Sequence, residues 1–150
     1  MSIFQSLNIT ASALTAQRLR MDVVSSNMAN VDTTRARFVN GQWEPYRRKL
    51  VVMEPRQEGF STYLQAAMNG RASVGDGVKV TEIVEDPTPF KLVYDPSHPD
   101  ADPNGYVRLP NVDPLKEMVD LMSATRSYEA NVTVFNATKG MLMKALEIGK

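Results

Sequence analysis

The residues best suited to chemistry lie in one short stretch, where His98, the only histidine, is followed by Asp100 and Asp102. A histidine oriented by a carboxylate can act as a general base, so a hydrolase is one hypothesis for this stretch. The surrounding sequence shows no serine or lysine in a nucleophile context and no glycine-rich phosphate loop, and the chain has no cysteine. We therefore interpret His98 as a loop histidine. We predict a chain that is not an enzyme and has no catalytic residue, cofactor or small-molecule substrate.

The same stretch resembles the opening of a calcium-binding loop, because Asp100, Asp102, Asn104 and Gly105 follow one another at suitable spacing. The twelfth position of such a loop would be Asn111, where the calcium loop requires a glutamate. The prolines of this stretch also disfavour the loop geometry. We interpret it as a turn and predict no metal site.

A second stretch combines aromatic and basic residues. Trp43 and Tyr46 precede the basic trio Arg47, Arg48 and Lys49, and such a set can stack on and pair with a polymer. The chain has 17 basic and 17 acidic residues, and this balance argues against nucleic acid as the partner. The alternative function that this stretch supports is a module that binds cell-wall glycan.

Composition divides the chain into three zones. Residues 1–34 contain no glycine or proline, whereas residues 35–111 contain six of the eight glycines and eight of the nine prolines. Residues 112–150 return to helix-forming types. We predict an α+β fold in which long terminal helices pair as a coiled-coil-like bundle. Residues 1–34 together with 112–150 form this helical domain, and residues 35–111 form a small β-rich domain with a turn-rich loop at 95–105.

Three segments of the middle zone have the two-residue period of strands. They are residues 49–53, 78–83 and 90–94, in which side chains alternate or β-branched residues follow one another. The residues between the last of these segments and Tyr106 are rich in proline, aspartate and glycine, which is typical of a loop.

Apolar residues recur every three or four positions in both terminal zones, which is the spacing of a coiled-coil seam. In the first zone the seam residues are Phe4, Leu7, Leu14, Met21 and Met28. In the last zone they are Met118, Leu121, Tyr128, Val132, Phe135, Leu142 and Leu146.

Four residues mark the expected ends of these helices. Asp113 can cap the second helix, Pro114 suits its first position, and Gly149 suits its end. Asn30 is expected to end the first helix, since asparagine tolerates the left-handed backbone conformation there.

Further apolar residues lie outside the seams, so pairing the two helices with each other leaves apolar surface in water. These residues are Val23, Val119, Met122, Val134, Met141, Met143 and Ile148. Burying one large apolar side chain contributes about 1.5–3 kcal/mol, and neighbouring subunits can supply the missing contacts. We predict that the seams form an assembly interface. The alternative is an ordinary helical core that the β-rich middle covers.

Polar residues beside the seams belong to the same predicted interface. Asn27 and Asn30 accompany the first helix, and Arg126 and Asn131 accompany the second. Arginine and polar side chains next to apolar anchors are typical of subunit contacts. The alternative for Arg126 is a solvated helix face with an ion pair to Glu129.

Three motifs, in order, resemble the flagellar basal-body rod and hook proteins. Residues 25–34 (SSNMANVDTT) are similar to the family's N-terminal signature, and residues 122–131 (MSATRSYEAN) are similar to its C-terminal signature. Residues 94–107, which begin YDPSHPDAD, resemble the proximal-rod subunits in particular. Arg35 stands where many relatives have glycine, and Ser26 replaces the first asparagine of the signature. Both departures affect the expected turn geometry only.

This resemblance implies a structural subunit that self-assembles and co-assembles through its terminal helices. The product is the axial drive shaft of the rod, which transmits torque and encloses the export channel. The implied partners are copies of the chain, other rod subunits, proteins at the junction of the membrane ring and rod, and the flagellar type III export apparatus. The implied place is the basal body, outside the cytoplasmic membrane. Export would use no cleaved signal peptide, which agrees with the absence of a basic and then apolar stretch in residues 1–8.

Overall fold

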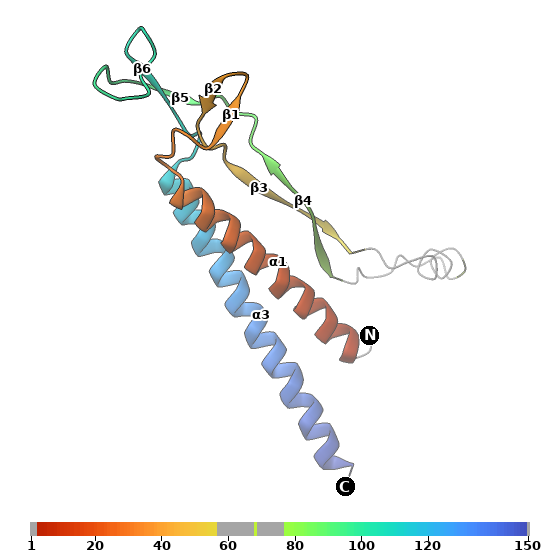
Figure 1. Cartoon of the computed structure of the whole chain (residues 1–150). Coiled ribbons are helices and arrows are strands. Elements are labelled where there is room, and N and C mark those ends of the chain that lie inside the picture. Colours follow the sequence, from red (N-terminus) through yellow and green to blue (C-terminus); the bar gives the residue numbers. More distant parts are fainter. Residues whose placement is uncertain (1–2, 57–67, 69–76, 150) are drawn as a thin grey trace. The chain divides into compact units, whose positions relative to one another are not determined.

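The computed structural model describes residues 3–56, 68 and 77–149 (Figure 1). A long helix at each end flanks a middle of short strands, which confirms the predicted α+β fold. The helices are α1 (Ile3–Ala29) and α3 (Pro114–Ile148). The strands are β1 (Arg37–Val39), β2 (Gln42–Glu44), β3 (Lys49–Pro55), β4 (Val78–Glu85), β5 (Lys91–Tyr94) and β6 (Tyr106–Leu109).

The strands pair two by two, as β1–β2, β3–β4 and β5–β6. The three predicted strand segments correspond to β3, β4 and β5. Sequence reasoning did not predict the β1–β2 hairpin or strand β6. The predicted loop at 95–105 is the connection within the antiparallel β5–β6 hairpin, where Tyr94 lies opposite Tyr106.

The chain divides into two compact units. Unit 1 comprises Met1–Leu19, Val52–Glu82 and Ala124–Lys150, and unit 2 comprises Arg20–Val51 and Ile83–Ser123. Each unit therefore contains a segment of both helices and part of the middle zone. The two domains predicted from composition separate the helical ends from the β-rich middle, and so they differ from these two units. The predicted domain division stays a prediction.

The two units have different interiors. In unit 1 the buried positions that the structure describes are small residues, namely Thr10, Ala16, Ala124 and Thr138. Unit 2 buries Val23, Val24, Tyr46, Val107 and Val112, together with the polar side chains of Asn27, Arg48 and Glu117. Since stabilisation by burial grows with apolar area, the described part of unit 1 gains less from its own core than unit 2 does.

The helix ends lie close to their predicted places. Asp113 Oδ1 accepts a hydrogen bond from Leu115 N at 3.1 Å, and α3 begins at Pro114 and ends just before Gly149. The first helix ends at Ala29, directly before Asn30. The expected left-handed conformation at Asn30 is wrong. Its side-chain amide instead donates to the carbonyl of Ser26 at 2.9 Å, which satisfies a free carbonyl of the last turn.

The unpredicted β1–β2 hairpin turns at Asn40 and Gly41, whose φ angles are 51° and 83°. Positive φ at both central residues is typical of a type I′ turn, and Asn-Gly is its preferred sequence. The Asn-Gly pair was therefore a sequence signal for this hairpin. Across it, the rings of Phe38 and Trp43 meet edge to face at 5.2 Å.

Comparing Gly41 with Gly140 measures the cost of the left-handed backbone at this turn separately from any side-chain clash. A Cβ added at Gly41 or at Gly140 meets nothing within 4 Å, but only Gly41 has positive φ. We expect Gly41→Ala to lower the free energy of unfolding by about 1–2 kcal/mol, because it forces a left-handed backbone on alanine. Gly140→Ala should raise it by up to about 1 kcal/mol, since alanine favours the helix. Urea denaturation of both variants tests this, and equal effects would contradict it.

Candidate assembly surfaces and a buried polar network

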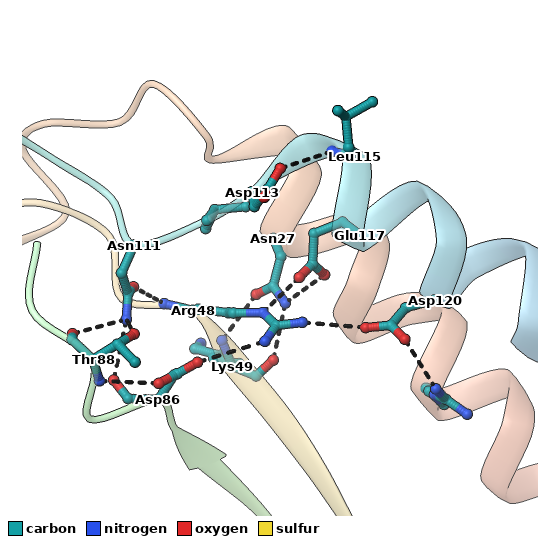
Figure 2. A network of polar contacts seen from close by, with 12 residues as sticks. Asn27, Arg48, Lys49, Asp86, Thr88, Asn111, Asp113, Leu115, Glu117 and Asp120 are labelled. Atoms are coloured by element: carbon teal, nitrogen blue, oxygen red, sulfur yellow. Dashed lines mark hydrogen bonds and ion pairs between the residues drawn. The ribbon is translucent and has the colours of Figure 1, made fainter. Parts of the chain in front are cut away.

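A buried arginine holds the centre of unit 2 (Figure 2). Arg48, which is only 6% exposed, directly precedes β3, and its Nε donates to Glu117 Oε1 at 2.5 Å. Its Nη2 donates to Asp120 Oδ2 at 3.2 Å, and its Nη1 lies 3.5 Å from Asp86 Oδ2. Glu117 is completely buried. The planar guanidinium thus joins the first turns of α3 to the turn after β4, a role that suits arginine because its donors are fixed in a fork.

Asn27 connects the end of α1 to the same centre. Its Nδ2 donates to the carbonyl of Lys49 at 2.9 Å and to Glu117 Oε2 at 3.0 Å. Its Oδ1 accepts from Lys49 N at 3.0 Å and from the Tyr46 hydroxyl at 3.0 Å. The amide has two donors and two acceptor positions, and all four are used within the chain. Asn27 is 1% exposed, so its direct contacts are internal, although it was predicted to lie in an assembly interface.

Asn111 completes the network on the other side of Arg48. Its Oδ1 accepts from the backbone N of Arg48 at 2.8 Å, and its Nδ2 donates to the carbonyls of Asp86 and Thr88. Thr88 N also donates to Asp86 Oδ1, and this bond is the main reason that the pKa of Asp86 lies below its ordinary value. Asn111 therefore fixes the turn after β4 against the segment that leads into α3.

Sequence reasoning missed Arg48, Asn111 and Glu117 as structural residues. One signal was available for Glu117, because it lies four positions before Leu121 and seven before Ala124. It therefore occupies the buried side of the helix, where an acidic residue needs a buried partner.

The acidic stretch with His98 is a loop that side-chain hydrogen bonds to Asp100 hold in place. Asp100 Oδ1 accepts from Arg35 Nε at 2.6 Å, and Asp100 Oδ2 accepts from Thr34 Oγ1 at 2.8 Å. His98 Nδ1 accepts from the backbone N of Asp100 at 3.1 Å. Asp102 and Gly105 form backbone bonds within the loop. Arg35, the residue that departs from the family pattern, thus anchors this loop to the segment after α1.

No cluster of three or more metal-binding side chains occurs among residues 3–56, 68 and 77–149. The same residues include no helix that is both long and apolar enough to cross a membrane.

The hydrogen bonds that Asp100 accepts predict that the order of this loop depends on pH. Hydrogen bonds from Arg35 and then from Thr34 hold the pKa of Asp100 below its ordinary value. A carboxyl with a lowered folded-state pKa stabilises the fold above its unfolded pKa, about 3.9, and that stabilisation is lost as the pH falls through the folded value.

We therefore expect the loop at 95–105 to loosen below about pH 4, and Asp100→Asn to remove the part of this change that arises at the contacts of Asp100 with Arg35 and Thr34. Amide exchange of the loop as a function of pH measures it. Asp102→Asn is the matched control, since the Asp102 side chain is exposed and makes no hydrogen bond or ion pair within the described residues. Identical profiles for the unaltered chain and Asp100→Asn would contradict the assignment.

The predicted aromatic and basic surface does not exist as one surface. The expectation of a single exposed surface is wrong because two of its residues point into unit 2. The Tyr46 hydroxyl donates to Asn27, and Arg48 donates to Glu117. Arg47 lies over the ring of Phe90, with Cζ 4.5 Å from the ring centroid. Trp43 remains 53% exposed. The glycan-binding alternative therefore has no support in the arrangement of these residues.

The predicted seam residues occupy intermediate and exposed positions. Those of α1 are half-buried, namely Leu7, Leu14, Met21 and Met28, except for Phe4, which is exposed. Half-buried residues of α3 are Leu121, Tyr128, Asn131, Val132, Phe135 and Leu142, and exposed ones are Met118, Arg126 and Leu146. The side chain of Asn131 donates to the Ser127 carbonyl at 2.8 Å. Whether these residues meet other subunits stays a prediction.

Large apolar side chains face outward along α3. Each of the following is at least 48% exposed: Leu115, Met118, Val119, Met122, Val134, Met141, Met143, Leu146 and Ile148. Single exposed apolar residues are common on soluble proteins, but a helix that displays so many of them indicates an interaction surface.

Comparisons with known proteins show the family of the chain. The family model for flagella basal body rod proteins matches residues 7–37, and the model for the C-terminal part of flagellar basal body rod FlgEFG proteins matches residues 104–148. The chain is 67% identical to the flagellar basal-body rod protein FlgC of Bacillus subtilis over the whole of both chains. It is 45% identical to the FlgC of Borreliella burgdorferi, over 99% of this chain and 98% of that one. The FlgC of Salmonella typhimurium is 43% identical over the whole of both chains. The chain therefore belongs to the flagellar basal-body rod protein family.

Proposed function

We propose that the chain is a structural, non-enzymatic subunit of the bacterial flagellar basal-body rod, in which it assembles with other rod components. The observation that carries this proposal is the exposed apolar surface of α3, found in a chain whose relatives are rod proteins. A subunit that is surrounded by neighbours buries such a surface on assembly.

The terminal helices supply the contacts between subunits. The outer edges of the seam residues, from Phe4 to Met28 on α1 and from Met118 to Leu146 on α3, contact copies of the chain and other rod subunits. Arg126 and Asn131 lie beside these apolar contacts, and Asn30 lies at the helix end. Asn27 contributes indirectly, because it fixes the end of α1 against β3 and α3. The assembled helices form a drive shaft that transmits torque and encloses the export channel.

The chain acts in the cell envelope outside the cytoplasmic membrane, and it reaches this place through the flagellar type III export apparatus without a cleaved signal peptide. It contacts proteins at the junction between the membrane ring and the rod. A search for this chain in purified basal bodies tests the location, and its absence from them would overturn the proposal.

A pair of exposed residues tests the assembly surface. Leu115 and Val119 are neighbours on one face of α3 and are 74% and 60% exposed. We expect Leu115→Ser combined with Val119→Ser to change the free energy of unfolding by less than about 1 kcal/mol, since neither side chain is in the core. The variant should nevertheless be depleted from basal bodies and should abolish swimming in cells without the unaltered subunit.

The matched control is Leu92→Ser, which removes an equally exposed apolar side chain from β5. It should leave swimming unchanged. Normal swimming of the double variant at α3 would contradict the role of this face.

A further inference from the structure

The last two turns of α3 expose large apolar side chains beside one charged pair, Lys144 and Glu147. Met141, Met143, Leu146 and Ile148 are between 55% and 86% exposed. With about 3.6 residues per turn, Met141 and Ile148 fall on one side of the helix and Met143 and Leu146 on the opposite side. So many exposed large apolar side chains within two turns indicate an interaction surface, here called the helix end, residues 141–148.

Within unit 1, α1 is too short to cover the helix end. Unit 1 contains α3 from Ala124 onward, but α1 only up to Leu19, so its segment of α3 is about two turns longer than its segment of α1. The carboxyl end of α3 extends past the start of α1 (Figure 1). Among the described residues of unit 1, α1 therefore leaves the side chains of residues 141–148 exposed, and a surface on another molecule can cover them.

Unit 2 contains a groove of matching chemistry. An open hollow of about 400 Å³ lies between the end of α1 and the end of β4, and its apolar lining residues are Val23 and Ile83. Ile83 is 45% exposed, although it is a large apolar side chain on a strand. A hollow of this size accepts a few large aliphatic side chains.

The charges at the rim of the groove complement those of the helix end. Asp22, Lys49 and Glu85 line the groove; Glu85 pairs with Arg37 and Arg47, whereas Asp22 and Lys49 take part in no ion pair within the described residues. The helix end carries Lys144 and Glu147, one turn apart, and these two pair only with each other at 2.7 Å on the exposed surface. Opposite charges on both partners fix the register of a contact and disfavour other partners.

We propose that residues 141–148 of one copy dock in the groove of a second copy, with Leu146 against Ile83 and Val23 and with Lys144 facing Asp22. This inference rests on the proposed rod function and names one contact that would build the polymer. The helix end and the groove are different surfaces of the chain, so the contact is heterologous. A heterologous contact that does not close into a ring extends into a helical filament, as a rod requires.

Because the chain has no cysteine, disulfide trapping can test this contact without background. One preparation carries Ile83→Cys and another carries Leu146→Cys, and the two are mixed at high concentration under a mild oxidant. Disulfides form only between residues whose Cα atoms approach to roughly 4.4–6.8 Å. We expect the mixed dimer to form at least about tenfold faster than the disulfide dimer of either variant alone. Leu92→Cys, an exposed position on β5, replaces Ile83→Cys in the control and should give only background.

Charge exchange separates docking from random collision. Lys144→Glu on the Leu146→Cys chain should reduce trapping, and Asp22→Lys on the Ile83→Cys chain should restore it. Trapping that favours Leu146 to Leu146, or that ignores both charge changes, would overturn the docking proposal. Such a result would leave the rod function standing if the chain is still found in basal bodies, whereas absence from basal bodies would remove the proposed function itself.

Discussion

Replacing Arg48 by methionine is expected to destabilise unit 2 by about 3–5 kcal/mol, because it leaves the carboxylate of Glu117 buried without its cationic partner. Glu117 is fully buried and receives the Arg48 Nε at 2.5 Å. Such a loss is a large share of the stability of a domain of this size. The remaining donor to Glu117 in the described structure is the Asn27 amide, which is uncharged.

The double variant Arg48→Met with Glu117→Leu provides the comparison. Replacing both members of a buried ion pair by apolar residues is often neutral or stabilising, so we expect the double variant to recover most of the loss. Urea denaturation of both single variants and the double variant gives the coupling energy of the pair. Arg20→Met is the matched control, since Arg20 bonds to the partly exposed Asp120 at 3.3 Å and should cost less than about 1 kcal/mol. Additive losses in the double variant would contradict the assigned pairing.

Asn27→Ala should have the second-largest effect, a loss of about 2–4 kcal/mol, because it leaves several buried polar groups without partners. The groups are the backbone N–H and carbonyl of Lys49, the Tyr46 hydroxyl and one oxygen of Glu117. Thermal and urea unfolding measure this loss. Amide exchange at Lys49 reports it locally, since that N–H loses its acceptor.

Asn30→Ala is the control for this prediction, because it removes the other asparagine of the same motif. The Asn30 amide is only half-buried and donates to one carbonyl of its own helix. We expect a loss near 1 kcal/mol or less. If Asn27→Ala and Asn30→Ala were equally mild, Asn27 would not be the link between α1, β3 and α3.

The buried network also bears on how the helices are presented for assembly. Asn27 and Arg48 tie the end of α1 and the start of α3 to one β element, so the directions of both helices in unit 2 depend on the same few polar groups. A loss at this centre is therefore expected to weaken incorporation into rods even where the altered residue touches no neighbour.

The sequence by itself determined the parts of this protein that depend on local spacing. The three- and four-residue recurrence of apolar side chains determined both helices, and Asp113 with Pro114 determined where the second one starts, because a capping bond spans only two residues. Alternation over four to six residues determined β3, β4 and β5. The Asn40-Gly41 pair also carried enough local information for the β1–β2 hairpin, although that signal went unused. The family motifs could also be identified from the sequence, because each is a short, contiguous run of residues.

Tertiary structure alone decided which polar residues lie inside. Arg48 stands in a basic trio that suggests a surface, yet its partner Glu117 is 69 positions away in the chain. Asn27 looks like its neighbour Asn30 in sequence, but only Asn27 meets the backbone of Lys49. A charged or amide side chain can be buried only where partners converge on it from several elements. That convergence depends on how the whole chain packs, and no local spacing encodes it.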